Sequence, residues 1–241
     1  MILRVDHLTK RYGAVEAVRD ISFGVAPGEV FALLGPNGSG KTTTLKCIVG
    51  LNVPTSGTIN IHGIDALADP IGARRHISYL PQRVVFPETL TAREVLRFHA
   101  RLRGLPSAAI EEGLLAVRFN GAADRPVGTF SGGMVQRLGL AVAAMPAAPV
   151  LLLDEPTASL DPQGVIRFRQ FVRDQRARGT TVIFSTHLLT EVEQLADRVA
   201  VFVGGRIVAC TDIGEIRRTF LANGTVEDMY LHYVGAAHDT P

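Results

Sequence analysis

Residues 35–42 of the chain read Gly35-Pro36-Asn37-Gly38-Ser39-Gly40-Lys41-Thr42 and fit the pattern GxxxxGK[ST]. An apolar run, 30–34, precedes them and an amphipathic stretch, 43–50, follows, so the pattern lies between an expected strand and an expected helix. Glycines let such a turn point several backbone N–H groups inward, and the helix brings the positive end of its dipole to the same place. The segment therefore predicts a binding site for phosphate groups.

Two interpretations of this segment compete. It could be a glycine-rich turn without a ligand, but the flanking strand and helix favour a P-loop, the phosphate-binding turn of nucleotide hydrolases. In a P-loop, Lys41 reaches the β- and γ-phosphates and the hydroxyl of Thr42 is placed to bind Mg²⁺. The chain has only three lysines, and Lys41 is one of them. Thr43, which follows the motif, completes the expected nucleotide-binding segment.

A second motif, Val150-Leu151-Leu152-Leu153-Asp154-Glu155-Pro156, places two carboxylates at the end of an apolar run. An exposed loop that begins after a buried strand would explain them without chemistry. Beside a P-loop strand, however, one carboxylate can hold the Mg²⁺ shell and its neighbour can orient or deprotonate an attacking water. We assign the first role to Asp154 and the second, that of the catalytic base, to Glu155.

The pattern along the chain predicts an α/β fold. Short apolar runs alternate with amphipathic stretches, as expected of a mostly parallel central sheet flanked by helices. The strongest expected strands are residues 30–34, 150–153, 181–185 and 198–203. Period-two segments at 2–5 and 20–24 predict a small antiparallel β subdomain beside the nucleotide.

The helical part of the chain is expected as an insertion. From about residue 84 to 149 the strand signals vanish and Ala, Arg and Leu recur at helical spacing, which predicts an inserted helical subdomain. We expect one main domain over 1–215 and a short helical tail over 216–241, whose last residues, 235–241, should fray.

Composition excludes several classes of protein. Lys and Arg number 25 against 23 Asp and Glu, a net charge of +2 without a basic arm, so no nucleic-acid partner is expected. Cys47 and Cys210 are far apart and lack metal-site spacing, which indicates a reduced, cytoplasmic setting. The N-terminus does not have the pattern of a signal peptide, and no apolar run approaches the length of a membrane span.

Together with the P-loop, Ser131-Gly132-Gly133 and Asp154-Glu155-Pro156-Thr157 resemble the motifs of the ATP-binding cassette (ABC) family in order and spacing, over about residues 1–215. The family's LSGGQ motif is replaced here by Phe130-Ser131-Gly132-Gly133-Met134. The resemblance implies an ATPase that uses ATP and Mg²⁺ and works as half of a dimer, with Ser131, Gly132 and Gly133 facing the γ-phosphate held by the opposite subunit. The serine hydroxyl and glycine N–H groups of that anion site survive both changes.

Three further positions match the family, each with a plainer alternative. Tyr12 is where the family places the aromatic ring that stacks on adenine, although a lone turn tyrosine is commonly structural. Gln82 resembles the glutamine that contacts Mg²⁺ and water, unless it is a surface residue. His187, one of seven histidines, follows the run 181–185 where the family keeps a histidine against the γ-phosphate.

The resemblance also implies partners: integral-membrane permease subunits and a second ATPase subunit, with a homodimer expected. The chain would then lie at the cytoplasmic face of the membrane, and residues 82–104 would form the groove for a permease helix. Val226-Glu227-Asp228-Met229-Tyr230-Leu231 looks like the ending of ABC-2 export ATPases. A weaker likeness is to the ATPase of nitrous-oxide-reductase maturation. An importer ATPase and a non-transport ABC ATPase, such as an assembly factor, remain alternatives.

Overall fold

A computed structural model gives the fold of residues 1–119, 121–219, 226–228, 230, 231 and 233, which are the described residues. Its centre is a sheet that runs, within these residues, β10-β9-β3-β8-β7-β6. The strands are β3 (Val30–Leu34), β6 (Ile77–Leu80), β7 (Val150–Asp154), β8 (Thr181–Thr186), β9 (Arg198–Val203) and β10 (Arg206–Asp212). Neighbouring strands are parallel from β9 to β6, and β10 is antiparallel to β9. The predicted mostly parallel sheet is confirmed.

The central sheet is buried on both faces, which explains its continuous apolar runs. Side chains of β3 alternate between two cores: Phe31 and Leu33 pack with the antiparallel sheet, and Ala32 and Leu34 pack with the helices. Every residue of β3, β7 and β8 is buried. These strands therefore fix the loops at their carboxyl ends in a rigid frame.

The antiparallel sheet has the order β2-β1-β4-β5 in the described part of the chain. Its strands are β1 (Leu3–Tyr12), β2 (Val15–Val25), β4 (Ser56–Ile61) and β5 (Ile64–Asp65). The segments predicted at 2–5 and 20–24 were too short because bulges interrupt the pairing of β1 with β2, between Val5 and Leu8 and again up to Arg11. A bulge breaks the period-two alternation on which the prediction depended. Strands β4, β5, β6 and β10 were not predicted.

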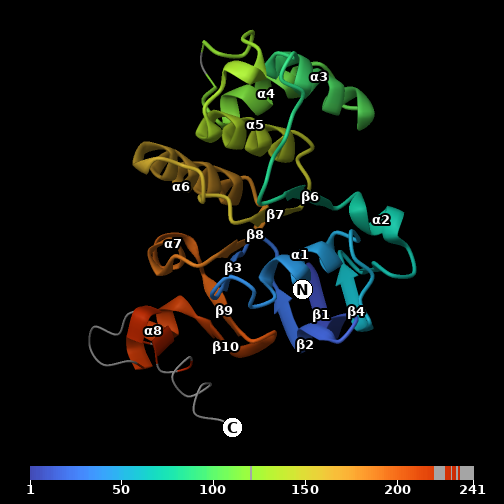
Figure 1. Cartoon of the computed structure of the whole chain (residues 1–241), viewed down its shortest axis with the longest axis vertical. Helices are drawn as coiled ribbons and strands as arrows, with labels where there is room; N and C mark the ends of the chain where they lie inside the picture. Colours follow the sequence, from blue (N-terminus) through green and yellow to red (C-terminus); the bar gives the residue numbers. More distant parts are fainter. Residues whose placement is uncertain (120, 220–225, 229, 232, 234–241) are drawn as a thin grey trace.

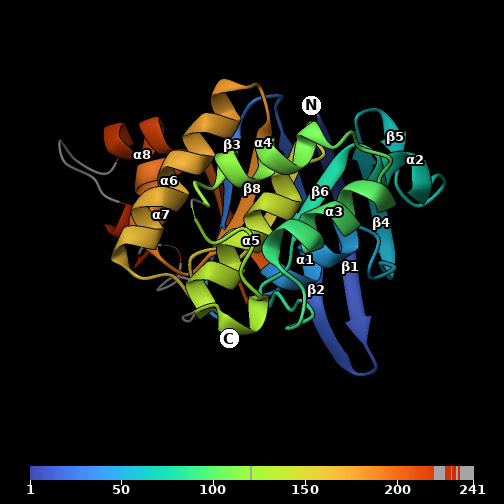
Figure 2. The ribbon, with the colours of Figure 1, turned by 90° about the horizontal axis from the view of Figure 1, so that it is seen from above.

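Most helices lie between the strands of the central sheet in the sequence. They are α1 (Lys41–Ile48), α2 (Pro70–Arg74), α3 (Ala92–Leu102), α4 (Ala108–Ala116), the 3-10 turn η1 (Val127–Thr129), α5 (Gly132–Ala144), α6 (Pro162–Ala177), α7 (Leu189–Leu195) and α8 (Ile213–Thr219). Figure 1 shows α3, α4 and α5 grouped at the top, away from β1, β2 and β4. Seen from above in Figure 2, α6 and α7 lie on one side of β3 and β8, and β1, β4 and β5 on the other.

The inserted helices begin and end at defined signals. Thr91 and Glu94 form a capping box at the start of α3, in which each side chain bonds the other's backbone. Helix α5 begins after Ser131, whose hydroxyl accepts from the N–H of Met134 at 3.3 Å. Residues 84–149 thus carry α3, α4, η1 and α5, while the division of the chain into domains at residue 215 stays a prediction.

The C-terminal region is described in part. Helix α8 starts at Ile213, three residues before the expected tail, and Val226 is buried. The expected fraying of 235–241, and Met229 in the tail motif, fall outside the described residues. None of the helices in the described part of the chain has the length and hydropathy that a membrane span requires.

Candidate nucleotide-binding site

The predicted site residues follow the carboxyl ends of four neighbouring strands. The glycine-rich loop follows β3, Gln82 follows β6, Asp154 ends β7 with Glu155 after it, and His187 follows β8. The register pairs Leu34 with Thr186 and Asp154 with Ser185. Because parallel strands all end at the same edge of a sheet, these loops converge, as is usual for binding sites of open α/β folds.

The loop between β3 and α1 depends on glycine at specific positions. A Cβ atom on Gly35 would lie 2.3 Å from the backbone oxygen of Phe202. Gly40 has a φ of +106°, and a Cβ there would lie 2.7 Å from the backbone oxygen of Ala17. The loop therefore packs too closely against β9 and β2 for any side chain at these two positions. Helix α1 begins directly after it, with its N-terminus at the loop.

The ammonium group of Lys41 is buried inside this loop. Its Nζ donates to the carbonyl oxygens of Gly35 at 2.7 Å and Pro36 at 3.0 Å, and lies 3.5 Å from Oε1 of Glu155. Burial lowers the pKa of the Lys41 ammonium, and the carboxylate of Glu155 opposes that change. A positive charge is thus held within the loop between β3 and α1.

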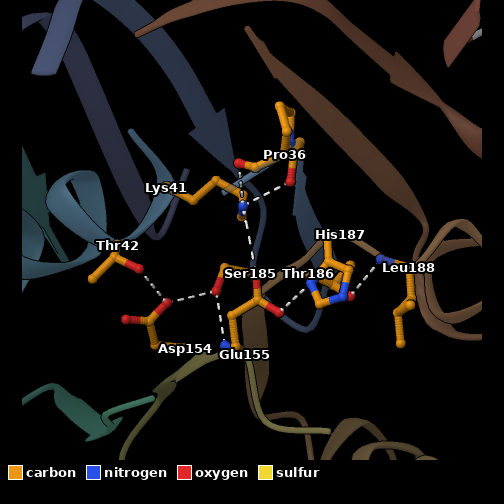
Figure 3. Close-up of polar contacts among 10 residues, drawn as sticks. Pro36, Lys41, Thr42, Asp154, Glu155, Ser185, Thr186, His187 and Leu188 are labelled. Carbon is orange, nitrogen blue, oxygen red and sulfur yellow. Dashed lines mark hydrogen bonds and ion pairs between the residues drawn. The ribbon is translucent and has the colours of Figure 1, made fainter. Parts of the chain in front are cut away.

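Asp154 is fully buried and receives hydrogen bonds on both carboxylate oxygens. Oδ1 accepts from Thr42 Oγ1 at 2.9 Å and from Ser185 Oγ at 2.7 Å (Figure 3). Oδ2 accepts from the hydroxyl of Tyr79 at 3.4 Å. The carboxylate of Asp154 and the hydroxyl of Thr42 therefore meet, and both offer oxygen atoms of the kind that Mg²⁺ prefers as ligands.

Glu155 and His187 form a second polar pair, also visible in Figure 3. Oε2 of Glu155 lies 2.9 Å from Nδ1 of His187, and the backbone N–H of Glu155 donates to Ser185 Oγ at 2.9 Å. Glu155 has a φ of +46°, in the left-handed region that non-glycine residues rarely occupy. Such strain persists where the surroundings hold a side chain in a required direction, and here it turns the carboxylate toward Lys41 and His187.

A cavity of about 250 Å³ lies over the loop. Of the predicted residues it is lined by Asn37, Gly38, Ser39, Gly40, Lys41, Thr42, Thr43, Gln82 and Glu155. Pro36, Asp154 and His187 contact this group through hydrogen bonds. Ala17, which was not predicted, also lines the cavity.

Tyr12 and the Ser131 loop do not line this cavity. The ring of Tyr12 is half exposed at the end of β1, and its hydroxyl accepts from Asn52 Nδ2 at 2.6 Å. Ser131 and Gly132 are exposed at the start of α5, and a Cβ on Gly132 would meet nothing within 4 Å. The predicted anion site at α5 is thus separate from the chain's own phosphate loop.

Two residues with functional contacts were missed. Ser185 joins the Asp154 carboxylate to the Glu155 backbone, and Tyr79 reaches the other oxygen of Asp154. A signal for Ser185 existed, since it is a polar residue directly after the apolar residues 182–184 of an expected strand. The contact of Tyr79 depends on the pairing of β6 with β7, which no sequence motif predicts.

The fold and the site define a P-loop nucleotide hydrolase. Comparison with known proteins narrows the class: residues 18–158 match the family model described as "ABC transporter", and the chain belongs to that family. As a member it binds and hydrolyses ATP.

Relatives of the chain are ATP-binding proteins of transport systems. The chain is 41% identical over 221 residues to the uncharacterized ABC transporter ATP-binding protein YxlF of Bacillus subtilis, covering 90% of this chain and 73% of YxlF. It is 39% identical to Nod factor export ATP-binding protein I of Ralstonia nicotianae, over 86% and 66% of the two chains. It is 37% identical to the bacitracin transport ATP-binding protein BcrA of Bacillus licheniformis, over 86% and 68%. The chain thus spans about two thirds to three quarters of these relatives.

Two solved structures share the fold. An ATP-binding subunit of an ABC transporter superposes with a TM-score of 0.87 at 33% identity, over 97% of this chain and all of the other. The ATP-binding cassette MJ0796, a dimer in a post-hydrolysis state with ADP and phosphate, gives 0.78 at 25% identity, over 87% and 98%.

Proposed function

We propose that this chain is the ATPase subunit of an exporter, and that it drives a membrane permease by closing and opening as a nucleotide-bridged dimer. The observation that carries the proposal is the separation of two halves of a site. Lys41, Thr42 and Glu155 line one cavity, while Ser131 and Gly132 are exposed at the start of α5 and do not line it. Two chains packed head to tail would bring each half against the other. The dimeric state of MJ0796 supports a dimer.

The chain's residues divide the work of hydrolysis. The loop N–H groups and Lys41 hold the phosphates, which requires Nζ to exchange the carbonyls of Gly35 and Pro36 for phosphate oxygens. Glu155 accepts the proton of the attacking water, and His187 fixes its carboxylate through the 2.9 Å contact. Tyr12 supplies a face for adenine, and its bond from Asn52 holds the ring in place.

Thr42, Asp154 and Gln82 are the residues proposed to hold Mg²⁺. The fit rests on the buried contact of Thr42 with Asp154, because both groups offer oxygen and Gln82 lines the same cavity. Mg²⁺ in such sites takes one or two protein ligands, with phosphate and water completing its shell. When bound, it neutralises charge on the phosphate oxygens.

A permease helix is proposed to dock in a groove beside α3, the cavity of about 490 Å³ formed chiefly by residues 79–87 and α3. Of the apolar residues predicted there, Val95 and Leu96 belong to the core, whereas Phe98 is 60% exposed and lines the groove with Val85. Arg83 and Arg103 also line it, and no Asp or Glu of the described residues does. We therefore expect an occupant that is apolar and carries carboxylates.

Export is supported by the names of relatives, since the proteins from Ralstonia nicotianae and Bacillus licheniformis are named for Nod factor export and bacitracin transport. The proposal places the chain at the cytoplasmic face of the membrane, held there by the permease. An importer ATPase or an assembly factor is the alternative, and the likeness to the nitrous-oxide-reductase maturation ATPase stays a prediction.

Membrane flotation from cells that make the chain with its own permease tests the proposal. The chain should float with the membranes, and Phe98→Glu should lower the recovered amount at least about fivefold. A carboxylate at this position replaces an apolar contact and repels the carboxylates expected on the occupant, and about 1 kcal/mol of lost binding corresponds to a fivefold change. Leu115→Glu is the matched control, because Leu115 is similarly exposed on the neighbouring helix α4 but does not line the groove. Recovery of the chain only with a soluble complex would favour the assembly alternative.

A further inference from the structure

Tyr79 occupies a position between the docking groove and the nucleotide site. Tyr79 lies on β6, the strand at the edge of the central sheet, and is one of the residues that line the groove, together with Val84 and Phe98. The same residue lines a second cavity of about 710 Å³, on the side of α2, which contains Arg74 and Arg75. Tyr79 is thus shared by the walls of two hollows on the surface where a partner is expected.

The other end of Tyr79 touches Asp154. Its hydroxyl donates to Oδ2 at 3.4 Å, whereas Thr42 and Ser185 both donate to Oδ1. Among the described residues, Tyr79 therefore supplies the hydrogen bond to the second oxygen of this buried carboxylate. Burial first, and then the charge of Asp154, raises the pKa of Tyr79 well above its ordinary value, so the hydroxyl keeps its proton and remains a donor.

We propose that Tyr79 is a positioning residue through which occupancy of the docking groove reaches Asp154 and the Mg²⁺ held there. The inference rests on the proposed function, in which the occupant is an apolar, carboxylate-bearing segment of the permease. An occupant of the groove would contact Tyr79, and a displacement of this residue would move its hydroxyl relative to Asp154. The orientation of Asp154 then depends on whether the groove is filled.

The expected effect of losing the Tyr79 hydrogen bond can be taken from what is known of metal sites in general. Groups that hydrogen-bond a metal ligand orient it, and losing one typically weakens metal binding or activity about 10–100-fold. At 3.4 Å the bond from Tyr79 is long, so we expect an effect at the bottom of that range or below it, about three- to tenfold. The coupling is also reciprocal: if an occupant of the groove changes the affinity for Mg²⁺, bound Mg²⁺ must change the affinity of the groove for that occupant.

That reciprocity gives a test that needs no turnover. The chain contains no tryptophan, so Phe98→Trp adds a single fluorophore in the groove. In this background, Mg²⁺ is titrated into protein saturated with the non-hydrolysable analogue AMP-PNP while the emission is recorded. We expect Mg²⁺ to shift the emission. Adding Tyr79→Phe should raise the half-saturating Mg²⁺ concentration about three- to tenfold and reduce the shift at least about threefold. AMP-PNP affinity without Mg²⁺ should not change.

Ser78→Ala is the matched control. It removes a hydroxyl from the neighbouring position of β6, where the buried oxygen has no hydrogen-bond partner among the described residues. It should leave both the Mg²⁺ titration and the emission shift as they are. Tyr79→Phe keeps the ring and so the groove wall. The inference would be overturned if Tyr79→Phe left the half-saturating Mg²⁺ concentration unchanged. It would also be overturned if Mg²⁺ caused no emission shift in the Phe98→Trp chain that keeps Tyr79. Failure of the unsubstituted chain to bind AMP-PNP would instead refute the proposed function on which it rests.

Discussion

Glu155→Gln is expected to lower ATP hydrolysis by about 10²–10⁴-fold, the usual contribution of a general base, while ATP stays bound. Glutamine keeps the shape of the side chain and can still contact His187, which lies 2.9 Å from Oε2 in the native chain. It cannot accept the proton of water. Hydrolysis is therefore lost without the loss of the phosphate cradle, which is formed by the loop after β3.

The variant should also accumulate as an ATP-bound dimer, because the γ-phosphate that bridges two chains is not removed. Steady-state phosphate release measures the first effect, and mass in solution with Mg²⁺ and ATP measures the second. Glu112→Gln makes the same change on the exposed face of α4 and should behave as the native chain. If Glu155→Gln hydrolysed ATP at the native rate, Glu155 would lose its role as the base.

Lys41→Met has the second large expected effect and acts on both binding and stability. Two charge-assisted hydrogen bonds to phosphate would be lost, which corresponds to a fall in ATP affinity of about 100-fold or more. The carboxylate of Glu155 would also lose a buried cation 3.5 Å away, and removing one partner of such a pair costs about 3 kcal/mol. Nucleotide titration and urea unfolding without nucleotide measure the two effects.

The double variant Lys41→Met with Glu155→Gln separates them. It removes the carboxylate that Lys41→Met leaves without its cation. Much of the lost free energy of unfolding should therefore be recovered, while ATP affinity stays low. Equal stability of the single and double variants would mean that the Lys41–Glu155 pair does not hold the fold in the nucleotide-free chain.

The sequence predicted the parts of the fold in which pattern and burial agree. Strands β3, β7, β8 and β9 each contain a run of at least three apolar residues because both faces of the sheet are buried, and they were expected within one residue of their bounds. Strand β1 was expected over only its first residues because its bulges break the alternation. Strands β4 and β6 are short, and their polar residues Thr58 and Ser78 weaken the signal.

The candidate site was predictable where a motif lies in one piece. Lys41 and Thr42 come with the phosphate loop, and Asp154 and Glu155 end an apolar run. The contacts that organise these residues join distant segments. Ser185 forms hydrogen bonds with Asp154 and Glu155, 31 and 30 positions away in the sequence, and Tyr79 forms one with Asp154, 75 positions away. Such pairs depend on strand order, which no local pattern contains. The separation of Ser131 from the phosphate loop likewise could be established only from the folded structure.

The central claim is that each ATP site is built from two chains, and mixing two inactive variants tests it. Lys41→Met disables the phosphate loop, and Ser131→Arg disables the anion site at α5. In a head-to-tail dimer of one of each, one site pairs an intact loop with an intact Ser131. Equal mixing should restore about one quarter of the native rate, because half of the dimers are mixed and each has one working site. A mixture as inactive as either variant would contradict the account.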